Sequence, residues 1–186
     1  MAKAEAILKL YAYISGAWVE LKDASPASGS WGMADNSQET RMAEIGEMRF
    51  ALNNASGIYS PNGPSALAGW SKGIPFKFVV TYEGGDHIRF FGAIEDIQLP
   101  SIPKDNKVYI TAVDWLDYAT KYPIVNPALL ENATADEAID TILAALTNSP
   151  QAQSISDGNY TFPTLFDTVR GNTKAYNEFS KLANSE

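Results

Sequence analysis

Few side chains in this sequence could carry out chemistry. The 186 residues include no cysteine and a single histidine, His87. These counts exclude a thiol nucleophile, a redox cysteine pair, a cysteine zinc site and a site built from several histidines of one chain. His87 follows Asp86 after a Gly-Gly turn and could form an acid–base dyad with it, but the sequence places no nucleophile as its partner. We interpret His87 as a histidine of a solvated turn or strand start.

Three pairs of carboxylates are the other candidates, because glycoside hydrolysis needs only two acidic groups. The pairs are Asp114 with Asp117, Glu95 with Asp96, and Asp136 with Glu137. In the first pair, Asp114 fits a helix N-cap and Asp117 fits an exposed helix position. The second pair lies on a strand, where neighbours point to opposite faces, and the third pair suits the first turn of a helix. A hydrolase that uses Asp114 and Asp117 is kept as the second alternative function.

The sequence lacks the common motifs for phosphate binding, for a catalytic serine and for metal binding. It contains no Walker loop, no GxSxG elbow and no HExxH pair, and the glycines between Gly57 and Gly73 do not open a helix. The sequence therefore predicts a protein that is not an enzyme, with no catalytic residue, no cofactor and no metal.

Three aromatic residues lie in two long segments that lack a sustained period. Trp31 belongs to the predicted loop 23–40, and Tyr59 and Trp70 belong to the predicted loop 54–73. Such rings could fill the ends of a β-barrel, contact a protein partner or stack on a sugar. We take all three as candidate interface residues, and the three interpretations stay open.

Composition and charge narrow the classes of partner. Apolar residues make up 45% and charged residues 19% of the chain, which is a globular composition. Acids outnumber bases 22 to 14, so the net charge of −8 does not suit specific nucleic-acid binding or an anionic membrane. No apolar run reaches the roughly 20 residues of a membrane span, and Met1–Glu5 does not begin a signal peptide. We expect no nucleic acid, no membrane insertion and no signal peptide.

Alternating apolar residues predict strands in the first two thirds of the chain. Residues 5–22 are expected to form a hairpin around Ser15-Gly16, with a helix over Ala4–Ala12 as the alternative. Further strands are predicted at 46–53, 74–82, 87–97 and 107–113. Gly92 indicates a bulge or corner where a side chain would not fit. The expected core consists of Met48, Phe50, Leu52, Phe76, Phe78, Val80, Ile94 and Ile110.

After these strands, the apolar residues recur at helical spacing. A short helix is predicted from Asp114, and a stronger one follows the capping box Thr134-Ala135-Asp136-Glu137. A third helix is predicted over 173–185. Its apolar stripe consists of Tyr176, Phe179 and Leu182. We expect this stripe to be exposed and to serve as a further candidate interface.

The order of elements predicts an α+β fold, with an N-terminal antiparallel β-barrel followed by short helices. The barrel domain is expected to span residues 1–125 and to carry both long loops. Residues 126–186 are expected to be a helical segment that starts a second, truncated domain. Since the third helix reaches Glu186 without a stop signal, we expect the chain to be a fragment of a longer protein.

Five motifs in one order carry a resemblance over residues 46–117. They are Gly46-x-Met48-x-Phe50-x-Leu52-x-Asn54, Gly57-Ile58-Tyr59-Ser60-Pro61, Gly69-Trp70-x-x-Gly73-Ile74-Pro75, Phe90-Phe91-Gly92-Ala93-Ile94 and Asp114-Trp115-Leu116-Asp117. This order resembles the N-terminal part of tail and baseplate hub proteins of bacteriophages and of the related late-control proteins of contractile tails. The capping box at Thr134 matches the helix that tends to follow the barrel of such proteins.

The resemblance implies a virion structural protein that acts through assembly. It implies a first β-barrel in a ring around the tail axis, other tail or baseplate proteins as partners, and a trimer or hexamer for the full-length protein. The protein would be made in the cytoplasm of the bacterial host and reside in the virion tail. A carbohydrate-binding or adhesin module is the first alternative.

Overall fold

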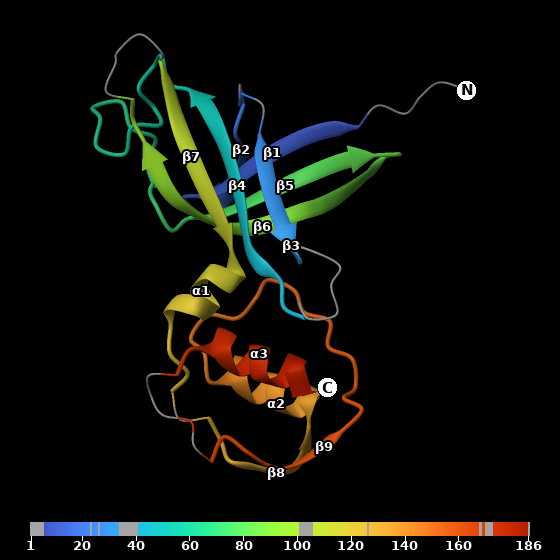
Figure 1. Cartoon of the computed structure of the whole chain (residues 1–186). Helices are drawn as coiled ribbons and strands as arrows, with labels where there is room; N and C mark the ends of the chain where they lie inside the picture. Colours follow the sequence, from blue (N-terminus) through green and yellow to red (C-terminus); the bar gives the residue numbers. More distant parts are fainter. Residues whose placement is uncertain are drawn as a thin grey trace. The chain divides into compact units, whose positions relative to one another are not determined.

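The computed structural model of the chain describes residues 6–22, 24–25, 27–33, 41–100, 106–125, 127–167, 169 and 173–185. The chain folds into two compact units. Unit 1 comprises Met1–Trp31 and Ile45–Trp115, and unit 2 comprises Gly32–Glu44 and Leu116–Glu186. Long strands dominate unit 1, whereas unit 2 holds short strands and helices (Figure 1).

Unit 1 is built on one curved antiparallel sheet. Its described strands are β1 (Ile7–Ile14), β2 (Ala17–Glu20), β3 (Ser28–Gly32), β4 (Glu44–Asn53), β5 (Pro75–Tyr82), β6 (Gly85–Gln98) and β7 (Lys107–Asp114). They lie side by side in the order β2-β1-β5-β6-β7-β4-β3. Side chains of β1 and β4, which are far apart in this order, belong to one core, so the sheet curls around it. The antiparallel sheet together with the later helices confirms the α+β class.

The predicted hairpin at the start of the chain is confirmed. β1 pairs with β2, and Tyr13 lies opposite Trp18. The turn residues Ser15 and Gly16 have φ values of 50° and 88°, which is the left-handed pair that a two-residue hairpin turn requires. The alternative helix over Ala4–Ala12 is wrong for its described part, because the strand begins at residue 7.

The prediction of a closed barrel is wrong. β2 and β3 are the two ends of the sheet order, and no pairing joins them among the described residues. The chain between them crosses from one edge to the other: Leu21 N donates to Leu10 O at 2.8 Å, and Ser25 N donates to Ala51 O at 2.7 Å. These contacts link the two edges through single hydrogen bonds rather than through a ladder, so the sheet is rolled but open.

The predicted loop 23–40 contains a strand that the sequence did not indicate. β3 runs at the edge beside β4 and is exposed along its length. A Cβ added to Gly29 would lie 3.0 Å from the carbonyl oxygen of Glu47, which is tighter than most side-chain contacts, so glycine favours this close approach of the two backbones. The Ser-Gly-Ser sequence has no apolar alternation, which is why this strand was missed. Residues 23, 26 and 34–40 of the predicted loop lie outside the described residues.

The predicted core is largely confirmed. Six of its members are buried: Met48, Phe50, Leu52, Phe76, Ile94 and Ile110. Phe78 and Val80 are only half-buried, which corrects the prediction for these two. The reason is that β1 and β5 extend past the core, so that Leu8, which lies opposite Val80, is 66% exposed.

Gly92 occupies the close approach that the sequence predicted. It lies opposite Asp114 in the β6–β7 pairing. A Cβ added there would come within 1.9 Å of the carbonyl oxygen of Val113. A side chain therefore does not fit at Gly92, and a register shift follows two residues later, between Ile94 and Asp96.

Unit 2 alternates helices with short strands. Its elements are α1 (Trp115–Lys121), which starts at the last residue of unit 1, then β8 (Leu130–Thr134), α2 (Ala135–Ala144), β9 (Thr161–Leu165) and α3 (Ala175–Ser185). β8 and β9 form an antiparallel pair. The predicted helical segment 126–186 therefore also contains two strands. Each strand has only five residues, and β8 is bent at Asn132 (φ 52°), so their alternation was too weak to detect.

The capping box that starts α2 is confirmed. The backbone N–H of Thr134 donates to the carboxylate of Glu137 at 2.9 Å. This contact satisfies an N–H that the first turn would otherwise leave without a helical partner. The buried face of α2 consists of Ala135, Ala138, Ile142 and Leu143.

Candidate interaction surface

Tyr59 and Trp70 meet inside unit 1. Successive turns fold residues 54–70 into a compact loop, in which Asn54 Oδ1 accepts from the N–H of Tyr59 at 2.9 Å. The two rings pack edge to face at 5.2 Å, and the indole N–H of Trp70 donates to Tyr59 O at 3.0 Å. Their exposed fractions are 8% and 3%. Of the three open interpretations, filling the core fits these two residues, and their rings offer little surface to a partner.

Trp31 is placed differently from the other two candidate rings. It lies on β3 and is 48% exposed. One edge packs against Phe90, with ring centroids 6.0 Å apart. Trp31 therefore has both a core contact and a free surface.

The stripe on α3 is covered within unit 2, so the expectation that it lies bare is wrong. Leu182 is 5% exposed, and Tyr176 and Phe179 are half-buried. The segment before β4 lies against this helix: Arg41 donates to Ala183 O at 3.1 Å, and the Tyr176 hydroxyl lies 3.4 Å from the carbonyl oxygen of Ala43. The sequence could not show this cover, because residues 41–43 lie far away along the chain.

His87 and its neighbour do not form a catalytic dyad in the described structure. His87 is exposed near the start of β6. The carboxylate of Asp86 accepts a hydrogen bond from the hydroxyl of Thr81 at 2.6 Å. This contact ties the two strands together at the hairpin end.

The candidate carboxylates make structural contacts. Asp114 accepts from the N–H of Gly46 at 2.8 Å, and Asp117 pairs with Lys121 at 2.7 Å. The ammonium of Lys72 and the amide of Gln98 bind Asp96 and hold the pKa of that carboxyl below its usual value.

The pKa of Asp136 is also lowered. A hydrogen bond from the side chain of Thr134, followed by one from the N–H of Gly158 at 2.9 Å, lowers the pKa of its carboxyl. A general acid for glycoside hydrolysis needs a raised pKa, so the lowered values of Asp96 and Asp136 favour structural roles. The described residues hold no group of three or more potential metal ligands. None of the helices in the described part of the chain is long and apolar enough to cross a membrane.

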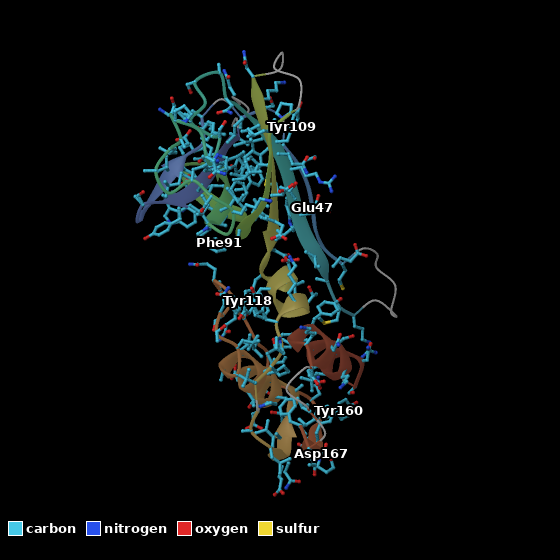
Figure 2. All side chains as sticks on the ribbon, turned by 90° about the vertical axis from the view of Figure 1, so that its left-hand side faces the viewer. Glu47, Phe91, Tyr109, Tyr118, Tyr160 and Asp167 are labelled. Atoms are coloured by element: carbon cyan, nitrogen blue, oxygen red, sulfur yellow. The ribbon has the colours of Figure 1, made fainter. Side chains whose placement is uncertain are left out.

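Sequence reasoning missed an aromatic cluster on the solvent side of the sheet. Register places Tyr11 opposite Lys77, Lys77 opposite Phe91, and Tyr13 opposite Trp18, so these side chains share one face. We call Tyr11, Tyr13, Trp18, Lys77 and Phe91 the outer aromatic face; Figure 2 labels Phe91.

Trp18 is the centre of the outer aromatic face. Its ring lies edge to face with Tyr13 at 5.3 Å and with Phe91 at 5.9 Å. The ammonium of Lys77 lies 4.3 Å from the centroid of the Trp18 ring and 5.2 Å from that of Tyr11, within cation–π range. The available signal was β1 itself, which carries Tyr11 and Tyr13 at outward positions, whereas its inward positions are all apolar.

Comparison with known proteins identifies the fold. No protein-family model and no curated protein sequence matches the chain. The tail protein from Neisseria meningitidis MC58 is structurally similar, with a TM-score of 0.57 at 10% identity, over 96% of this chain and 45% of that protein. The tail protein of prophage MuSo2 from Shewanella oneidensis matches with a TM-score of 0.52 at 11% identity, over 96% of this chain and 50% of that protein. The chain thus has a fold found in phage tail proteins and spans about half the length of the two solved ones.

Proposed function

We propose that this chain is a non-enzymatic structural component of a phage tail hub or baseplate, or of a related contractile-tail apparatus. The observation that carries the proposal is the fold shared with two solved tail proteins over 96% of the chain. The protein would act by assembling with other tail proteins, as a trimer or hexamer in its full-length form, and would reside in the virion tail.

The positions of the resemblance motifs support the hub assignment. Gly46, Gly92 and Asp114 come from three separate motifs and meet where β4, β6 and β7 lie together. Gly46 donates its N–H to Asp114, and a Cβ on Gly46 would come within 2.4 Å of that carboxylate. These motif residues therefore maintain backbone packing, which is what a shared scaffold requires.

The two alternative functions gain less support. Trp70 cannot serve as a sugar platform in this conformation, because it is 3% exposed and its N–H is bound to Tyr59. Of the three candidate rings, only Trp31 keeps an exposed surface for the carbohydrate-binding alternative. For the hydrolase alternative, Asp117 is paired with Lys121.

Gene disruption tests the proposal. The gene would be deleted in the phage or prophage that encodes it, and the particles examined by electron microscopy. We expect absent or incomplete tails, restored by the wild-type gene and equally well by Asp117→Asn, since no acid chemistry is required. Intact, infective tails without the gene would contradict the structural role, and failure of Asp117→Asn alone with normal protein levels would favour the hydrolase.

A further inference from the structure

The outward side of β4 and β7 carries a hollow that is lined mainly by polar side chains. Its volume is about 520 Å³, which lies within the range of roughly 300–1,000 Å³ of small-molecule sites. The register accounts for the hollow, because the short side chain of Ala51 lies opposite the ring of Tyr109 and leaves space beside that ring. The chain before β3 bounds it: Ser25 N donates to Ala51 O at 2.7 Å, and Ser25 and Ser28 belong to the lining.

An aromatic ring and a planar amide lie on neighbouring strands at this hollow. Tyr109 is 43% exposed, and Gln98 lies opposite it in the β6–β7 pairing. The amide of Gln98 donates to the carboxylate of Asp96 at 2.7 Å, which holds the amide in place. Thr111, two residues further along β7, adds a hydroxyl to the lining. A ligand would therefore meet an apolar ring together with hydrogen-bonding groups that are already positioned.

A second, smaller hollow adjoins the first. Its volume is about 260 Å³, and it shares Ser28 and Arg49 with the larger hollow. Arg49 binds the carboxylate of Glu47, but its guanidinium carries five N–H donors, more than this carboxylate engages. We call the two hollows together the polar groove, which crosses β3, β4 and β7; Figure 2 labels Glu47 and Tyr109 on it. Its extent suits a chain of linked units better than one small molecule.

The charges at the polar groove balance. The described charged residues that line or border it are three bases and three acids: Arg49, Lys72, Lys107, Glu47, Glu95 and Asp96. Two of the bases are already paired, because Arg49 binds Glu47 and Lys72 binds Asp96. The groove therefore favours a ligand that is uncharged but rich in hydrogen-bonding groups.

We propose that the polar groove binds a neutral oligosaccharide. A sugar ring has an apolar C–H face, which would stack on Tyr109, and hydroxyls at its edge, which would hydrogen-bond to Gln98 and Arg49. An extended peptide fits less well, because its apolar side chains would face hydroxyls, an amide and a guanidinium. The site adds a ligand to the proposed structural role and is independent of that role. It also differs from the carbohydrate-binding alternative above, which relied on Trp31 and Trp70.

Nuclear magnetic resonance of the full chain is the first test. The ¹⁵N-labelled protein would be titrated with maltotriose, cellotriose and triacetylchitotriose, each up to about 20 mM, because an open groove of this size should bind with roughly millimolar affinity. We expect at least one of them to shift the amides of Ala51, Tyr109 and Thr111, while those of Trp18 and Tyr82 stay in place. Trigalacturonate, a charged trisaccharide, should bind more weakly. No shift with any of the three neutral sugars, or tighter binding of trigalacturonate, would overturn the proposal.

Removal of the ring is the second test. Tyr109→Ala should weaken binding at least about tenfold, because it removes the stacking surface. Tyr82→Ala is the matched control, since Tyr82 is a tyrosine of nearly equal exposure, 42%, on β5. Circular dichroism and thermal melting of each variant would show that the fold persists. Equal affinities of the two variants would contradict stacking on Tyr109.

Filling the hollow is the third test. Ala51→Leu places a larger side chain beside Tyr109 without removing any polar group, so it should abolish the shifts. Ala17→Leu, at an exposed position on β2, is the control and should bind as the wild type does. Wild-type affinity in a folded Ala51→Leu chain would show that the sugar does not occupy this hollow and would overturn the proposal. That result leaves the tail function intact, since gene disruption tests that function separately.

Discussion

The two units of the chain build their cores from different side chains. In unit 1, long strands bring large rings together, and Phe76, which is fully buried, stacks on Phe50 with centroids 5.0 Å apart. In unit 2, fully buried alanines such as Ala138 and Ala175 lie on α2 and α3, and among its described residues only Ile124 and Ile142 are large and fully buried. Unit 1 therefore depends on the volume of its rings, whereas unit 2 depends on few large side chains together with caps and hydrogen bonds.

The largest expected effect is in the ring core of unit 1. Phe76→Ala removes a ring that is 0% exposed, so it should lower the free energy of unfolding by about 3–5 kcal/mol through lost burial and a residual cavity. Urea unfolding would measure it. Tyr82→Ala, on the same strand but 42% exposed, should change stability by less than about 1 kcal/mol. Similar losses for both would show that ring volume does not define this core.

In unit 2, the strongest effect is expected at Ile142. This side chain is 0% exposed on α2, and Ile142→Ala should lower the free energy of unfolding by about 2–4 kcal/mol. Hydrogen exchange would locate the change: amides of α2 and α3 should lose protection more than those of β4 and β7. Leu129→Ala, at an exposed position of unit 2, is the control. Equal loss of protection in both units would contradict separate cores.

The same difference explains how far the sequence could predict the fold. The strands of unit 1 were predicted because large residues alternate, as at Met48, Phe50 and Leu52. β3 was missed because Ser28, Gly29 and Ser30 give no apolar alternation, although Gly29 favours the close approach of β3 to β4. In unit 2, the capping box at Thr134 was recognised because it is local in sequence.

The interaction surface was harder to predict than the core. The sequence singled out rings in long segments, and two of these, Tyr59 and Trp70, complete the core. The outer aromatic face depends on three pairings between strands, which alone bring Trp18 beside Phe91. A pattern along one strand shows which residues share a side, but not which neighbouring strand extends that side or whether anything covers it.

A smaller effect is expected at the cap of α2. Thr134→Ala removes the N-cap hydroxyl and should destabilise unit 2 by about 1 kcal/mol. Thr134→Ser keeps a capping hydroxyl and should retain most of the stability. Thermal unfolding of both variants would measure this difference. If Thr134→Ala and Thr134→Ser are equally stable, the cap contributes little and unit 2 relies on its few large side chains.

The smallest effects are expected at two half-buried carboxylates, Asp96 in unit 1 and Asp136 in unit 2. The pKa of Asp96 is lowered chiefly by Lys72, and that of Asp136 chiefly by the side chain of Thr134. A carboxyl whose pKa is lower in the folded state stabilises the fold above its usual pKa, and this stabilisation is lost as the pH falls through the folded-state value. Asp96→Asn and Asp136→Asn should therefore each reduce the loss of stability between about pH 7 and pH 3.

Salt should distinguish the two carboxylates. The partner of Asp96 is a charged ammonium on the surface, so raising the ionic strength should screen the pair and shrink the difference between wild type and Asp96→Asn. The donors to Asp136 are a hydroxyl and a backbone N–H, which carry no net charge, so its difference should persist in salt. Urea unfolding at both pH values, with and without added salt, would measure the four differences, and Asp157→Asn is the exposed control. An equal response of Asp96 and Asp136 to salt would mean that the charge of Lys72 is not what distinguishes the two carboxyl groups.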